Sequence, residues 1–102
     1  MSFTPEFRGA AEMLVDMFVK RISDKKNLEN ILEFYHIDRK CQYFYVFGFY
    51  HASMEAEIRN MYLARYKKGM DDSDLKDTWE IIKRREKEVD RILTGYGIGS
   101  TS

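Results

Sequence analysis

Three side chains in this sequence have the chemistry to bind a transition metal or to act as nucleophile and base: His36, Cys41 and His51. A structural zinc site needs four such ligands, arranged in close pairs. On a straight helix Cys41 and His51 lie ten residues apart, or about 15 Å along the axis, which is too far to share an ion or a proton. We therefore expect no metal and no cofactor, with a buried cysteine and two ordinary histidines.

The acidic residues form no calcium-binding or catalytic pattern. Residues 71–77, DDSDLKD, have the acid content of a calcium loop. An EF-hand, however, needs glycine at its sixth position and glutamate at its twelfth, and neither falls correctly here. Asp71, Asp72 and Ser73 suit the N-terminus of a helix instead. The glycines of 95–99 follow no predicted strand and precede no predicted helix, so they do not form a phosphate loop. The sequence therefore predicts a protein that is not an enzyme.

The length and charge of the chain limit the kinds of protein it can be. A chain of 102 residues forms one domain with a hydrophobic core. Its 17 basic and 17 acidic residues cancel, so no overall field draws it to nucleic acid or to an anionic membrane. The longest uncharged run, 41–54, is too short to span a bilayer. A single cysteine and the lack of a secretory pattern at the N-terminus predict a cytoplasmic protein.

Apolar residues recur at helical spacing through most of the chain, which predicts an all-α fold. Thr4, followed by proline, marks the start of a helix, and Gly69 and Gly95 mark helix ends. We expect a single helical domain, 1–95, followed by a flexible Gly/Ser tail, 96–102. The domain is a compact bundle of about four helices, with a long central third helix: residues 5–22, 27–36, 39–68 and 73–93.

The third segment contains the run YFYVFGFY, residues 43–50, whose rings and valine taken alone favour a β-strand. Polar and apolar residues do not alternate in it, and the chain has no second strand-like run to pair with it. The pattern also continues into a plainly helical stretch. We therefore predict a helix. One face of it should belong to the core, and it carries Tyr43, Phe47, Tyr50, Met54, Ile58, Met61 and Arg65.

The fourth segment has a coiled-coil-like seam with one acid, Glu86, on it. The other seam residues are Leu75, Trp79, Ile82, Val89 and Leu93. A carboxylate in an apolar seam is costly unless it is paired or reaches water. Two interpretations follow. Either Glu86 reaches solvent or a neighbour such as Arg85, or it pairs across a helix interface and fixes the register.

The opposite face of the third helix combines rings with small residues. Gly48, Ala52 and Ala56 repeat every fourth residue, a spacing that lets another helix approach closely. The whole face consists of Tyr45, Gly48, Phe49, Ala52, Ala56 and Leu63. Either the other three helices sheathe it, or a second chain covers it. We expect a small interaction protein that docks a protein partner or a second copy here, as a homodimer or as an assembly or accessory subunit of viral or plasmid origin.

The alternative is a small nucleic-acid-binding regulator. Its candidate residues are the basic ends of the third helix: Arg39 and Lys40 at one end, and Arg65, Lys67 and Lys68 at the other. An RNA-recognition sheet is excluded, because the chain has at most one candidate strand. A basic helical surface remains the form that such binding would take. No small-molecule substrate is predicted.

Overall fold

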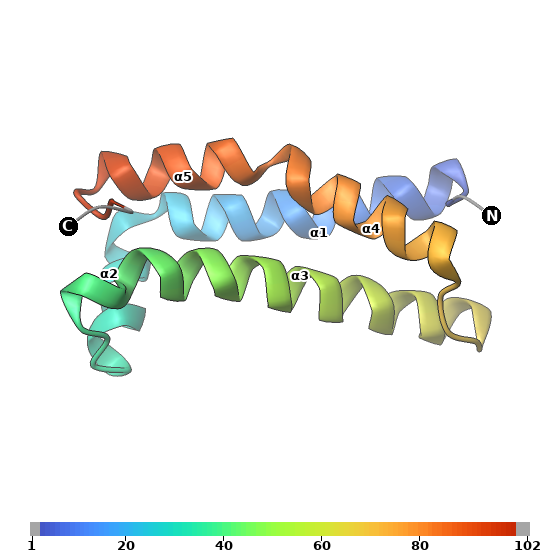
Figure 1. The fold of residues 1–102 in the computed structure, drawn as a ribbon, viewed down its shortest axis with the longest axis horizontal. Helices are drawn as coiled ribbons and strands as arrows, with labels where there is room; N and C mark the ends of the chain where they lie inside the picture. Colours follow the sequence, from blue (N-terminus) through green and yellow to red (C-terminus); the bar gives the residue numbers. More distant parts are fainter. Residues whose placement is uncertain (1–2, 100–102) are drawn as a thin grey trace.

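The computed structural model describes residues 3–99, and these form helices without any β-strand (Figure 1). The predicted all-α fold is therefore confirmed. The bounds of three predicted helices differ from those in the structure. The second helix begins and ends two residues earlier than predicted, a short 3₁₀ turn precedes the third helix, and the fourth segment forms two helices. The elements are α1 (Pro5–Ser23), α2 (Lys25–Phe34), η1 (Arg39–Cys41), α3 (Gln42–Tyr66), α4 (Asp72–Arg84) and α5 (Glu86–Gly95).

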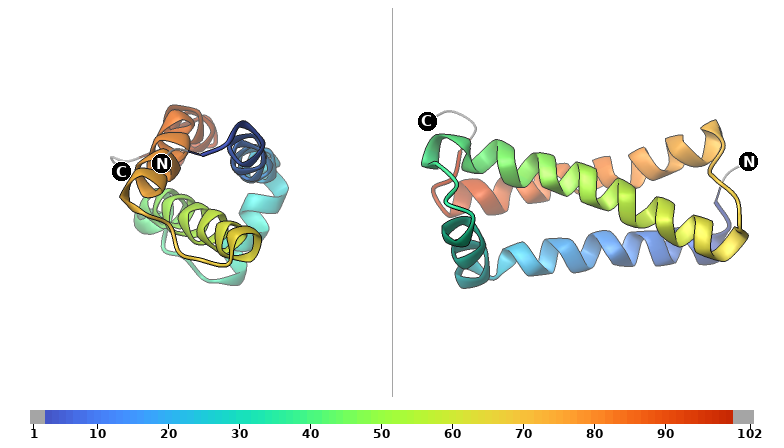
Figure 2. Two further views of the ribbon diagram at one scale, coloured as in Figure 1. Left: turned by 90° about the vertical axis from the view of Figure 1, so that its right-hand side faces the viewer. Right: turned by 90° about the horizontal axis from the view of Figure 1, so that it is seen from below.

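Three rods lie side by side along an elongated body of 41 × 23 × 20 Å. They are α1, α3 and the pair formed by α4 and α5, with α2 lying crosswise at one end (Figures 1 and 2). The chain turns back through α2 before α3 and through the short connection after it, so α3 runs antiparallel to the other two rods (Figure 1). The molecule is therefore a three-rod bundle closed at one end by α2, and α3 has only two rods beside it.

Local signals explain where the helices begin. The Thr4 side chain accepts a hydrogen bond from the Phe7 backbone amide (3.2 Å), and the Asp24 side chain accepts one from the Asn27 backbone amide (3.2 Å). Asp71 and Asp74 form a reciprocal capping box at the start of α4. The acids of the DDSDLKD segment are thus structural at this helix start.

The ends of α3 differ from the prediction. Cys41 lies in the 3₁₀ turn η1 and is exposed, whereas the sequence predicted a buried cysteine. The left-handed residue that ends α3 is Lys67 (φ 59°), whereas the sequence favoured Gly69. The Lys67 amide bonds the Leu63 carbonyl (2.8 Å), which compensates for the cost of this conformation in a residue with a Cβ.

The predicted seam of the fourth segment is correct at Ile82, Val89 and Leu93, which are buried, and wrong at Leu75 and Trp79. The helix also breaks at Arg85. The side chain of Arg85 bridges Asp16 of α1 (3.5 Å) and Glu88 of α5 (2.7 Å). Trp79 is 51% exposed and Leu75 only half-buried. The buried residues of this rod are Asp74, Thr78, Ile81, Ile82, Val89 and Leu93.

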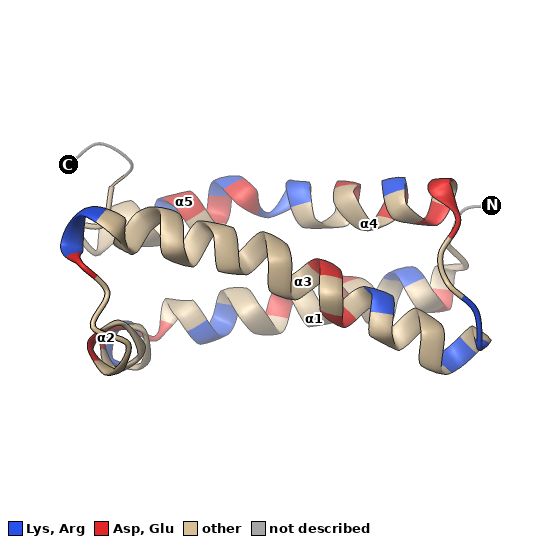
Figure 3. Ribbon diagram, turned by 60° about the horizontal axis from the view of Figure 1, so that its bottom comes forward, with Lys and Arg blue, Asp and Glu red and all other residues tan. Residues whose placement is uncertain are grey.

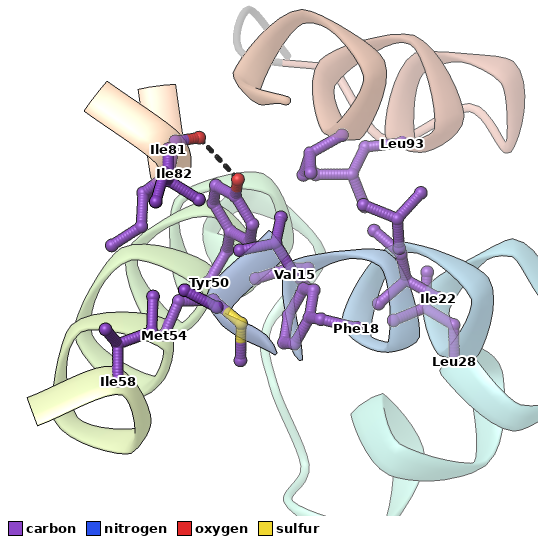
Figure 4. Packing of buried hydrophobic residues seen from close by; sticks show 14 of the residues in the cluster. Val15, Phe18, Ile22, Leu28, Tyr50, Met54, Ile58, Ile81, Ile82 and Leu93 are labelled. Atoms are coloured by element: carbon purple, nitrogen blue, oxygen red, sulfur yellow. Dashed lines mark hydrogen bonds between the residues drawn. The ribbon is translucent and has the colours of Figure 1, made fainter. Parts of the chain in front are cut away.

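The core lies between the three rods, and α3 contributes a buried stripe that recurs every fourth residue (Figure 4). Tyr50 lies at its centre and is completely buried, with its hydroxyl donating to the Ile82 carbonyl. Phe47 and Met61 of the predicted core face are only half-buried, and Arg65 is exposed. We call the following residues the buried stripe: Val46, Tyr50, Met54, Ile58 and Tyr62.

The predicted tail of 96–102 is described as far as residue 99, and that part contacts the bundle. The Tyr96 hydroxyl donates to the Ser23 carbonyl at the end of α1, and Ile98 packs against the core. Gly97 takes the left-handed conformation (φ 82°) that turns the chain back. Residues 100–102 lie outside the described residues. The predicted domain boundary at 95 did not include these contacts.

Candidate protein-interaction site

The side of α3 away from the other rods carries exposed apolar side chains. We call it the outer face, and its residues are Phe44, Tyr45, Gly48, Phe49, Ala52, Ala56 and Leu63. Phe44, Phe49 and Leu63 are 63%, 54% and 51% exposed, and the three small residues are also exposed. Tyr45 is half-buried. The bundle does not sheathe this face, so that interpretation of the sequence is wrong.

The helix geometry explains why the two faces separate so clearly. Positions two residues apart along an α-helix point about 200° apart around its axis. The series 48, 52 and 56 is therefore opposite the series 46, 50, 54 and 58 over its whole length. Both series drift around the helix together, as expected when α3 crosses its neighbours at an angle. The four-residue spacing that builds the core therefore also places these three small residues on the outward side of α3.

Ring contacts hold the aromatic part of the outer face in place. Tyr45 and Phe49 stack with ring centroids 6.4 Å apart and planes 7° apart, and Phe49 also lies 6.1 Å from Phe18 of α1. Phe44, which the sequence analysis did not include, makes an edge contact with Tyr43 at 5.2 Å. Rings fixed in this way lose little further freedom when a partner covers them.

A shallow hollow of about 640 Å³ runs along the outer face, over the stripe of small residues. Its polar border on the α4 side comes from Glu55, which accepts from the Trp79 indole (2.7 Å) and from Arg59 (3.2 Å). The first half of α3 has no Lys, Arg, Asp or Glu, as the uniform tan of that part of the ribbon shows (Figure 3). The lining consists of Gly48, His51, Ala52, Glu55, Ala56, Arg59 and Asn60.

His51, at the edge of the hollow, connects α3 to α5. Its Nε2 lies 2.7 Å from Oε1 of Glu86, and its Nδ1 lies 2.8 Å from the Phe47 carbonyl. Both partners are acceptors, so only the doubly protonated ring donates to both. Glu86 thus pairs across a helix interface, as one interpretation expected. Its neighbour Arg85 bonds other acids. His51 was not predicted as the partner of Glu86.

Three tyrosines on the core side of α3 are structural hydrogen-bond donors. Burial and a hydrogen bond to Asp90 raise the pKa of Tyr43 to about 12. A hydrogen bond to Asp74 (2.7 Å), together with burial, raises the pKa of Tyr62 to about 12. Burial also raises the pKa of Tyr50. These phenols stay protonated, and none of the three has the lowered pKa that a general base would need.

The structure does not bring the basic residues of the alternative function together. Arg39 and Lys40 lie in η1 at one end of α3, and Arg65, Lys67 and Lys68 lie at the other end (Figure 3). At 1.5 Å per residue, the two groups are separated by roughly 35 Å. They therefore form two small patches, with the uncharged half of α3 and the Glu55, Glu57 and Arg59 turn between them.

Other kinds of site find no support among residues 3–99. No three His, Cys, Asp or Glu side chains of this part of the chain come close enough to hold a metal ion. None of the helices described is both long and apolar enough to cross a membrane. Comparisons with protein-family models, with curated proteins and with solved structures found no match for this chain.

Proposed function

We propose that this protein is a non-enzymatic interaction protein and that a second copy of the chain docks on the outer face of α3. The observation that carries the proposal is the exposure of three large apolar side chains, Phe44, Phe49 and Leu63, around a stripe of small residues. Exposed apolar side chains gathered on one face of a helix often mark a protein-interaction surface. With a single cysteine, the protein suits a reducing compartment such as the cytoplasm.

A two-fold axis at Ala52 gives a self-complementary register. In an antiparallel pair, Gly48 of one copy then faces Ala56 of the other, and Ala52 faces itself. The two helices can approach closely because these positions carry little or no side chain. The same register puts Tyr45 near Arg59 of the second copy, in range of a cation–π contact. A net charge of zero adds no repulsion between copies.

The available area fits a dimer of moderate affinity. Covering the exposed halves of Phe44, Phe49 and Leu63 in both copies removes roughly 600 Å² of apolar surface from water, or about 15 kcal/mol before association costs. Those costs are about 4–15 kcal/mol. We therefore expect a dissociation constant on the order of micromolar, with monomer predominant at high dilution.

Sedimentation equilibrium across a range of concentrations tests the proposal. The wild-type chain should dimerise, whereas Phe49→Glu and Ala52→Glu should stay monomeric with unchanged helical circular dichroism. Met13→Glu is the matched control, because Met13 is 64% exposed on α1, away from α3. It should dimerise like the wild type. A wild-type chain that stays monomeric at millimolar concentration would contradict the homodimer, and retention of that monomer on nucleic acid at low salt would favour the alternative function.

A further inference from the structure

A second hollow lies where the end of α1, the crosswise helix α2 and the start of α3 meet. It has a volume of about 250 Å³. Phe18 and Ile22 line it from α1, Leu28 and Ile31 from α2, and Val46 from α3. Tyr35, Tyr45 and Phe49 add aromatic rings, and Arg21 and Asn27 complete the lining. We call this the three-helix pocket. This pocket was not predicted, because its walls come from three separate segments of the sequence.

The lining of the three-helix pocket favours a ligand that is mainly apolar. Eight of its ten side chains are aliphatic or aromatic, and such a cavity holds water poorly because water finds few polar partners there. Pockets for drug-sized ligands usually measure about 300–1,000 Å³. This pocket is smaller, so it fits a ligand of about ten non-hydrogen atoms.

The positive charge of Arg21 in the lining favours a ligand with a negatively charged end. Arg21 is the one charged side chain that lines the pocket, and no Asp or Glu lines it. Within residues 3–99, no carboxylate lies within ion-pair distance of the Arg21 guanidinium. The neighbouring hollow beside α2 is different, since Glu29 and Glu33 line it together with Arg39. An unpaired guanidinium at an apolar cavity is a site for a carboxylate.

The surrounding contacts keep the pocket formed. The side-chain amide of Asn27 donates to the Arg21 carbonyl (3.3 Å), which ties the start of α2 to the end of α1. Leu28 is only 2% exposed and anchors α2 in the core. On the α3 side, Tyr45 and Phe49 are held by their stacking. The walls therefore do not need to be rebuilt when a ligand enters.

We propose that the three-helix pocket binds a small amphipathic monocarboxylate, such as a medium-chain fatty acid, with its chain among the apolar walls and its carboxylate on Arg21. This site is separate from the proposed dimer contact, although Tyr45 and Phe49 border both. For a ligand of about ten non-hydrogen atoms, we expect a dissociation constant on the order of 0.1 mM.

The test compares octanoate with octanol, below their aggregation limits, by NMR titration of the full chain at a concentration where it is monomeric. Octanoate should cause saturable shifts of the Leu28, Ile31 and Val46 amides and bind about five- to tenfold more tightly than octanol. Arg21→Gln should lower octanoate affinity to that of octanol. Lys26→Gln, which removes an exposed cation of α2 outside the pocket lining, is the matched control and should change nothing.

Ile31→Trp, which fills the half-buried edge of the pocket, should abolish binding of both ligands while the chain stays folded. Three results would overturn the proposal: no saturable shift at these amides, equal binding of octanoate to wild type and Arg21→Gln, or shifts spread along the outer face with a loss of thermal stability. None of them bears on the dimer, whose test uses no ligand.

Discussion

Replacing Gly48 by alanine should stabilise the folded monomer. Gly48 lies inside α3, and a Cβ added there would meet no other atom within 4 Å. No contact within the chain therefore requires glycine. Alanine in a helix interior is favoured over glycine by about 0.5–1 kcal/mol, because it loses less backbone entropy on folding. We expect the free energy of unfolding to rise by that amount.

Urea denaturation and thermal melting of dilute, monomeric protein measure this change, and for a chain of this size the midpoint temperature should rise by about 2–8 °C. Gly9 provides a matched control. It is also an exposed glycine inside a helix, α1, and a Cβ added there would also meet nothing within 4 Å. Gly9→Ala should give the same gain.

The two positions should differ only in association. A leucine at Gly48 would occupy the space that we assign to Ala56 of a second copy, whereas a leucine at Gly9 would point into solvent. Gly48→Leu should therefore weaken dimerisation at least tenfold while Gly9→Leu leaves it unchanged. The reasoning fails if Gly48→Ala destabilises the dilute monomer, because the glycine would then serve its own chain, or if Gly48→Leu dimerises normally.

Three further predictions concern the core and its charges. Tyr50→Phe should cost about 1–2 kcal/mol in urea denaturation, since it deprives the Ile82 carbonyl of a buried donor; an unchanged midpoint would contradict this. The pKa values of Tyr43 and Tyr62 are raised to about 12. The hydrogen bonds of these two phenols therefore contribute fully to stability below about pH 10, and this contribution is lost as the pH rises towards 12. Tyrosinate absorbance should appear together with unfolding and not before it. Glu86→Leu should cost about 0.5–1 kcal/mol by removing the partner of His51, and a double-mutant cycle with His51→Gln that shows no coupling would remove the register interpretation.

Much of the secondary structure follows from signals within a few residues. Thr4, Asp24 and Asp71 cap helices because their side chains accept bonds from amides three residues later. The two faces of α3 could also be predicted, because helical spacing alone separates the series that contains Tyr50 from the one that contains Ala52. These features depend on backbone geometry, which is the same whatever packs against the helix.

The break at Arg85 could not be predicted in this way. Neither proline nor glycine marks it, and at the break Arg85 pairs with Asp16, a residue 69 positions away. On either side of the break, Trp79 faces solvent and Glu86 meets His51. Contacts between distant segments have no signature at short range, so spacing alone wrongly placed Leu75 and Trp79 in the seam.

The sequence by itself determined an all-α fold, the helix starts and the existence of two apolar faces on α3, since each depends on local chemistry. Only the tertiary structure decided which of these faces is open. With only two rods beside α3, burial is complete for Tyr50 and incomplete for Phe49. The three-helix pocket likewise exists only because α2 lies across the end of the bundle and brings Arg21, Ile31 and Val46 together.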